Sequence, residues 1–209
     1  MTKSAARPVS RQEAKVATRE ALIDAGMVAF GAEGLDASLD GICSRAGYTR
    51  GAFYVHFRDR DDFLVAIMDR VGEEFLEALF APAEPLKSEP PSLTAIVVRF
   101  LEAIRSGSYP LTKKGGVRPH QLLQACARSP VVRARYVALI DASRDHVAQL
   151  VARDQQGGHA EVRSDVDPSE IATLLLAAVI GAQTMLELEV PLDPGALGTA
   201  VLKLLRRRR

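Results

Sequence analysis

The residues best suited to chemistry lie at positions 45–60, which read R-A-G-Y-T-R-G-A-F-Y-V-H-F-R-D-R. Three aromatic side chains and a histidine fall within 53–57, although only 5% of the chain is aromatic and it holds no tryptophan. Arginine and tyrosine donate hydrogen bonds to phosphates, and arginine also reads base edges. Gly51 removes side-chain bulk beside them. These residue types favour a surface that reads nucleic acid.

Helical spacing divides these side chains between a core face and an exposed face. Phe53 and Phe57 are four residues apart, so they share one face, which we expect to pack against Phe30, Ile42 and Cys43. The other positions turn away from that core: Gly51 and Val55 lie opposite it, Arg50 and Tyr54 on one flank, and Ala52 and His56 on the other.

Three helices must position this face. Apolar spacing predicts helices over 18–32, 39–46 and 50–57, with Ser38 and Thr49 as N-caps and a sharp break at Gly47. Two short helices joined by a glycine-containing turn are typical of a helix-turn-helix, whose second helix enters the major groove. The helix N-terminus also offers free N–H groups to phosphate.

Residues 18–68 resemble the N-terminal domain of the TetR family of bacterial transcriptional repressors. The resemblance rests on T-R-E-A-L-I-D-A-G-M-V-A-F-G-A-E-G, L-D-G-I-C-S-R-A-G-Y and T-R-G-A-F-Y-V-H-F-R-D-R-D-D-F-L. Arg60 stands where the family usually has lysine, and Cys43 where alanine is more frequent. The resemblance implies a DNA surface in which Ser38, Thr49, Tyr54, His56 and Arg60 touch phosphates and Arg50, Gly51 and Val55 face bases, with Ala52 on the same surface.

Charge and cysteine content indicate the kind of partner and the cellular compartment. Residues 1–19 hold five Lys or Arg against one acidic residue, and 206–209 are all arginine, whereas the whole chain carries only +1. A basic arm suits a polyanion, although it also reads as a solvated tail. Two distant cysteines and a polar N-terminus without an apolar signal segment predict a reduced, cytoplasmic protein.

The rest of the chain predicts six further helices, so the expected fold is all-α: a three-helix DNA-binding domain followed by a six-helix domain. We expect a basic arm at 1–17, the helix-turn-helix domain at 18–60, a regulatory and dimerisation domain at 61–205 and an arginine tail at 206–209.

Residues 171–188 are apolar on nearly all sides, which requires burial on two sides. A four-helix bundle with a second subunit explains this, and a central helix of a monomeric core is the alternative. Polar residues within the stretch argue against a membrane span. The predicted homodimer interface consists of Leu175, Val179, Ala182, Leu197, Val201 and Leu204.

The family resemblance places an effector site among the middle helices. Seven candidates lie at inward spacing and an eighth, Gln121, is added for its polar side chain. The seven are Phe100, Ile104, Leu122, Cys126, Tyr136, Ile140 and Ser143. The same positions also suit ordinary core packing. They carry no cluster of like charge, so we expect a small, mostly apolar effector. The four histidines, at 56, 120, 146 and 159, have no metal-ligand spacing, and we expect neither metal nor cofactor.

The function that follows is a homodimeric, effector-responsive repressor that binds a palindromic operator in double-stranded DNA. Two alternatives belong to other classes: an all-α enzyme, and a helical interaction module without specific DNA binding. An enzyme requires an acid–base pair or a metal cluster, and the sequence offers no such pattern.

Overall fold

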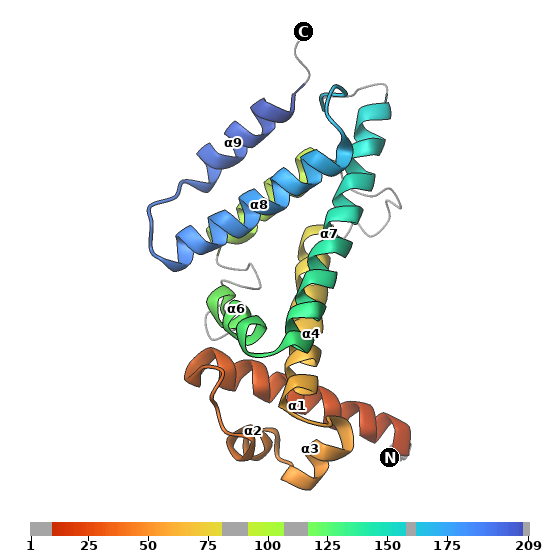
Figure 1. Cartoon of the computed structure of the whole chain (residues 1–209), viewed down its shortest axis with the longest axis vertical. Helices are drawn as coiled ribbons and strands as arrows, with labels where there is room; N and C mark the ends of the chain where they lie inside the picture. The colour runs from red at the N-terminus through yellow and green to blue at the C-terminus, as the bar shows by residue number, and fades with distance from the viewer. Residues whose placement is uncertain (1–9, 81–91, 107–116, 158–161, 207–209) are drawn as a thin grey trace, which may run out of the picture.

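The computed structural model describes residues 10–80, 92–106, 117–157 and 162–206, in which nine α-helices form (Figure 1). Within these ranges the only extended pairing is an isolated bridge between Val162 and Arg206. The all-α prediction is therefore confirmed. The helices are α1 (Arg11–Glu33), α2 (Leu39–Ala46), α3 (Arg50–His56), α4 (Arg60–Phe80), α5 (Leu93–Ser106), α6 (Pro119–Arg128), α7 (Pro130–Gln156), α8 (Pro168–Glu187) and α9 (Pro194–Leu205).

The molecule is elongated, with α1, α2 and α3 at one end (Figure 1). Helix α4 leads away from them and packs along α7, which in turn packs against α6 and α8. Helix α5 packs against α9, α4 and α7. We call the end formed by α1, α2 and α3 the recognition end. It is connected to the opposite end, where α9 lies, mainly through α4, α6 and α7.

Side-chain caps explain where several helices begin. The Ser38 hydroxyl accepts a hydrogen bond from the Gly41 amide at 3.0 Å, and the Thr49 hydroxyl accepts one from Ala52 at 3.3 Å, as predicted. Ser129 ends α6 and also caps α7, because its hydroxyl accepts from the Val132 amide. Proline follows at the first position of α7, where its missing N–H costs nothing.

The first helix begins at Arg11, seven residues before the predicted start, so residues 11–17 are helix and not a flexible arm. A reciprocal capping box sets this start: the Ser10 hydroxyl accepts from the Glu13 amide at 3.1 Å, and the Glu13 carboxylate accepts from the Ser10 amide at 2.7 Å. The apolar pattern begins only later because these first turns are exposed. Residues 1–9 and 207–209, which include the rest of the predicted arm and most of the arginine tail, lie outside the described ranges.

One hydrophobic core unites the recognition end with the helices behind it. The ring centroids of Phe53 and Phe57 lie 5.1 and 4.8 Å from that of Phe63, which belongs to α4. Helices α1 and α4 touch at Gly26, where a Cβ atom would lie 2.4 Å from Phe63. The same core continues to Leu122 of α6. The predicted domain boundary after residue 60 therefore falls at the start of a helix whose first half completes the first domain.

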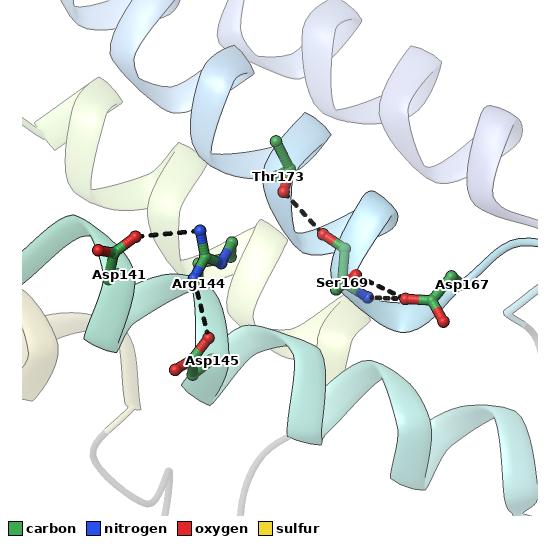
Figure 2. A network of polar contacts seen from close by, with 6 residues as sticks. All are labelled: Asp141, Arg144, Asp145, Asp167, Ser169 and Thr173. Atoms are coloured by element: carbon green, nitrogen blue, oxygen red, sulfur yellow. Dashed lines mark hydrogen bonds and ion pairs between the residues drawn. The ribbon is translucent and has the colours of Figure 1, made fainter.

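Three charged residues of α7 lie close to one another. Arg144 contacts Asp141 at 3.0 Å and Asp145 at 3.3 Å, as Figure 2 shows. On the neighbouring α8, the Asp167 carboxylate accepts from the amide and hydroxyl of Ser169 (Figure 2). Because Arg144 follows Ser143, these contacts matter for the cavities described below: the charges beside Ser143 are paired along their own helix.

Candidate nucleic-acid interface and apolar cavities

The turn between α2 and α3 has the tight geometry of a helix-turn-helix. Gly47 ends α2 in the left-handed conformation, with φ of 78°, which a side chain would strain. Tyr48 and the cap residue Thr49 follow, and α3 begins at Arg50. The turn residues and caps are therefore those predicted.

Helix α3 divides between core and solvent as its spacing predicts. Phe53 and Phe57 are buried, whereas Tyr54 is 50% and Val55 66% exposed. A Cβ atom at Gly51 would meet only the Thr49 hydroxyl, at an ordinary 3.6 Å. The fold itself therefore leaves room for a side chain at position 51, so glycine there keeps space free outside the subunit.

Arg50 is held on this exposed face by weak, solvent-exposed contacts. Its guanidinium lies 3.4 Å from the Asp40 carboxylate of α2, and both side chains are more than half exposed. The Tyr54 hydroxyl, and then Asp40, raise the pKa of Arg50, so its charge is permanent. An exposed pair of this kind contributes little stability, and the guanidinium can exchange its carboxylate partner for a base or phosphate at small cost.

Arg60, which is predicted to contact a phosphate, also makes contacts within the protein. Its guanidinium donates hydrogen bonds to the carbonyl oxygens of Leu35 and Ala37, the latter at 2.8 Å, and lies 5.3 Å from the centroid of the Phe30 ring. Burial lowers its pKa. Because these carbonyls belong to the loop between α1 and α2, the half-buried Arg60 ties that loop to the start of α4. Sequence pattern could not reveal this, since its partners lie more than twenty residues away.

The structure adds a basic stripe on α1 to the predicted surface. Arg11, Lys15 and Arg19 are spaced four residues apart, so they share one helix face, and all three are exposed. Burial, and then the charges of Lys15 and Arg19, lower the pKa of the half-buried His56 in α3. Arg19 also lies 5.4 Å from the ring centroid of Phe57, the residue that ends α3, so this end of the stripe lies beside the recognition helix. The excess of basic residues near the N-terminus was the sequence signal for it.

A first cavity, of about 90 Å³, lies between α4, α6, α7 and α8. Four predicted effector residues line it: Leu122, Tyr136, Ile140 and Ser143. Sequence reasoning missed the wall that α4 supplies through Met68, Val71, Gly72 and Leu76, and the α8 side chains Leu176, Val179, Ile180 and Gln183. Burial raises the pKa of Tyr136, so its hydroxyl keeps its proton at neutral pH.

A second cavity, of about 70 Å³, lies between α5, α7, α8 and α9. Phe100, another predicted effector residue, lines it, and Ser143, Leu176 and Val179 border both cavities. The predicted side chain of Ile104 is not among those described.

Two predicted effector residues lie elsewhere in the fold. Cys126 is buried in the core shared with the recognition end. Gln121 is also buried, and its amide donates to the Phe30 carbonyl of α1 at 2.7 Å. This correction has a physical reason: one face of α6 lies toward α1 and another toward α7, and only Leu122 reaches the first cavity.

The predicted dimer residues also need correction. Ala182 is buried within the subunit, Val179 borders both cavities, and Leu175, Leu197 and Val201 line the second one. Leu204 alone of the predicted six is largely exposed, at 66%. The outward face of α8 instead carries the exposed Leu174, Ala177 and Met185 and the half-buried Gly181, and the exposed Leu188 follows at the end of the helix. Helix α8 is long and apolar enough to cross a membrane by composition alone, but it packs against α7 and lines both cavities.

Within the described ranges, no group of three or more His, Cys, Asp or Glu side chains is placed to hold a metal ion. His120 of α6 contacts the Glu187 carboxylate of α8 through both its backbone amide, at 3.2 Å, and its ring. This contact fastens the first turn of α6 to the end of α8.

The exposed recognition helix and its supporting core define a helix-turn-helix transcriptional regulator, and comparisons with known proteins agree. Residues 22–67 match the family described as bacterial regulatory proteins, tetR family. The chain is 30% identical to the HTH-type transcriptional regulator SrpR of Pseudomonas putida over 153 residues, which are 73% of this chain and 68% of that protein. The chain belongs to the TetR family.

Solved structures share the whole fold. The SmeT–triclosan complex has a TM-score of 0.71 and 25% identity, covering 91% of this chain and 92% of that one. SmeT is described as the repressor of a multidrug efflux pump of Stenotrophomonas maltophilia. A TetR-family regulator from Cytophaga hutchinsonii has a TM-score of 0.74 at 17% identity, covering 97% and 100% of the two chains. The family relatives are transcriptional regulators, which disfavours the enzyme and interaction-module alternatives.

Proposed function

We propose that this chain is a homodimeric repressor in the cytoplasm, which binds a palindromic DNA operator through α3 and releases it when a small, mostly apolar effector binds. The observation that carries the proposal is the exposed face of α3, with Tyr54 and Val55 outward above the buried phenylalanines. Arg50 is the base reader, Gly51 and Val55 face the groove, and Ser38, Thr49, Ala52, Tyr54 and His56 border the phosphates.

The basic stripe of α1 widens this surface. Arg11 and Lys15 are exposed on the same face of α1 as Arg19 and therefore suit the phosphates that flank each half-site. Arg19 lies 5.4 Å from the centroid of the Phe57 ring and 3.5 Å from the Glu20 carboxylate, so it is tied more closely to the protein.

The dimer forms through the outward faces of α8 and α9. Leu174 and Leu188 are 56% and 69% exposed in the single subunit, and Leu204 of α9 lies outward as well. Apart from its chain neighbours and the nearby backbone of α8 itself, no described atom comes within 4 Å of where a Cβ atom at Gly181 would lie, so a partner helix can approach closely there. Covering these side chains removes a large apolar surface from water, which is the main driving force for association.

Helix α6 is the element through which an effector acts on DNA binding. Leu122 lines the first cavity, and the adjacent Gln121 is bonded to the end of α1. At the other end of α6, Arg128 contacts Asp36 at 2.7 Å, and the Ser129 hydroxyl donates to the Asp61 carboxylate of α4 at 2.6 Å. An effector that displaces α6 therefore changes contacts with both α1 and α4, and with them the spacing of the two recognition helices.

The experiment that tests the proposal is retention of genomic DNA fragments by the purified protein, followed by sequencing and gel-shift titration. We expect a near-palindrome whose half-sites lie roughly 34–36 Å, or a multiple, apart. Retention of random fragments with one common affinity would contradict a sequence-specific regulator. The retained operator then serves in a competition assay, in which an effector must weaken DNA binding by the factor by which DNA weakens effector binding.

A further inference from the structure

The two cavities are neighbours that share a wall. Ser143 of α7 and Leu176 and Val179 of α8 border both. Beyond this wall the first cavity continues toward Tyr136 and the second toward Val147. These two residues are eleven positions apart on α7, which at about 1.5 Å per residue separates them by roughly 16 Å along the helix axis.

Polar groups are distributed unequally between the cavities. The side chains of Tyr136, Ser143 and Gln183 belong to the lining of the first, whereas Ser143 is the only polar side chain among the described residues around the second. Neither described lining contains an acidic or basic side chain. Arg144, which follows Ser143 on α7, contacts the carboxylates of Asp141 and Asp145 (Figure 2).

Size limits the shape of an occupant. A cavity of about 150 Å³ accepts a benzene ring, and the two cavities, at about 90 and 70 Å³, are each smaller. A rigid ring therefore requires rearrangement of either cavity. A flexible, unbranched chain can instead divide its volume between both, once the side chains of Leu176 and Val179 at the shared wall rotate aside. An extended chain advances roughly 1.3 Å per carbon, because C–C bonds of about 1.5 Å zigzag, so roughly a dozen atoms span the distance.

We propose that the effector is a neutral aliphatic amphiphile, whose hydrogen-bonding head lies in the first cavity and whose unbranched tail extends into the second. Tyr136 and Gln183 bind the head, and the tail contacts Val97, Phe100 and Val201. This inference rests on the proposed function, since it names the ligand class of the same effector site. It also places the tail against α9, which connects the effector to a helix of the dimer face.

The test is a homologous series of 1-alkanols, from butanol to decanol, titrated calorimetrically into the full-length protein at pH 7, with octanoate as the charged counterpart of octanol. Burial of each methylene should tighten binding about fourfold, and therefore roughly fifteenfold per two carbons, through the whole series. Octanoate should bind more than about 100-fold more weakly than octanol, because its carboxylate has no cation to pair with. Equal affinities of hexanol and decanol, or of octanol and octanoate, would overturn the proposal.

A variant that fills the second cavity distinguishes the contributions of the two cavities to binding. Ala178 lines only the second cavity, so Ala178→Leu should abolish the gain from butanol to decanol while butanol still binds as in wild type. Ala138→Leu, at an exposed position of α7 outside both linings, is the matched control and should keep the full gain. An unchanged chain-length dependence in a folded Ala178→Leu protein would contradict the tail assignment, and the wild-type series decides the question by itself if that variant unfolds.

Operator binding by the same preparations distinguishes a wrong ligand class from a wrong proposed function. If the protein binds its operator but shows no chain-length dependence, the ligand class is wrong and the regulator function stands. If it fails to discriminate operator from random DNA, the proposed function itself is wrong, whatever the alkanols do.

Discussion

Lys15 provides the sharpest test of the enlarged DNA surface, because a phosphate contact has a quantitative salt signature. Lys15 is exposed on α1, and its charge acts on His56 of the recognition helix. Each phosphate neutralised adds about 0.9 to the slope of log affinity against log salt. A homodimer carries two copies of Lys15, so Lys15→Ala should reduce that slope by about 1.8. Between about 50 and 200 mM salt, the wild-type protein should then lose about 12-fold more affinity than the variant.

The assay is a gel-shift or fluorescence-anisotropy titration of operator DNA at several salt concentrations. Lys203→Ala is the matched control: it removes the same charge from an exposed position on α9, toward the far end of the subunit (Figure 1). Its slope should equal that of the wild type. Random duplex DNA should show the same reduction with Lys15→Ala, since phosphates carry no sequence information. Equal slopes for wild type and Lys15→Ala would refute the assignment, and equal reductions in both variants would mean that net charge alone is responsible.

The remaining predictions concern the operator, the dimer, the fold and pH. Arg50→Ala should weaken operator binding by about 1–3 kcal/mol but random DNA binding far less, as gel shifts on both would measure; equal losses would argue against base contact. Leu174→Asp should give monomers in light scattering, whereas Val137→Asp, an exposed control on α7, should remain dimeric. If both variants are dimers, α8 does not form the interface. Arg60→Ala should lower the free energy of unfolding in urea by about 2–3 kcal/mol, because two carbonyls lose a charged donor; normal stability with weakened DNA binding would restore its predicted phosphate role. The pKa of His56 is lowered in the folded protein, so its contribution to stability should be present above the unfolded pKa of about 6.5 and lost as pH falls through the lower folded value; urea midpoints of His56→Gln should depend less on pH over that range.

The recognition end could be predicted closely because its signals are local. The cap residues, the turn at Gly47 and the four-residue spacing of Phe53 and Phe57 all act within one or two helical turns. Arg60 shows the limit of such reasoning. Its charge and its place after α3 favoured a phosphate contact, yet its partners are the carbonyls of Leu35 and Ala37.

The start of α1 was missed for a different reason. Apolar periodicity marks the part of a helix that packs, and the first turns of α1 pack against little, so only the Ser10 and Glu13 capping pair signals them. A search for caps as well as for apolar stripes would have found this start, and with it the basic stripe beside the recognition helix.

The all-α class, the helix-turn-helix and the residues that α3 exposes follow from local sequence patterns, because helical periodicity fixes where each side chain lies around its own axis. The inward side of α8, in contrast, depends on how the helices pack together. That helix is apolar nearly all round, so its pattern does not indicate which face is buried. The buried face is set by α7, which packs against α8, and by α9, which lines the same cavity. Leu175, Val179 and Ala182 consequently turn toward the subunit's own interior, while Leu174 and Leu188 remain exposed for a partner. The cavities likewise exist only where four helices, distant in sequence, leave space between them.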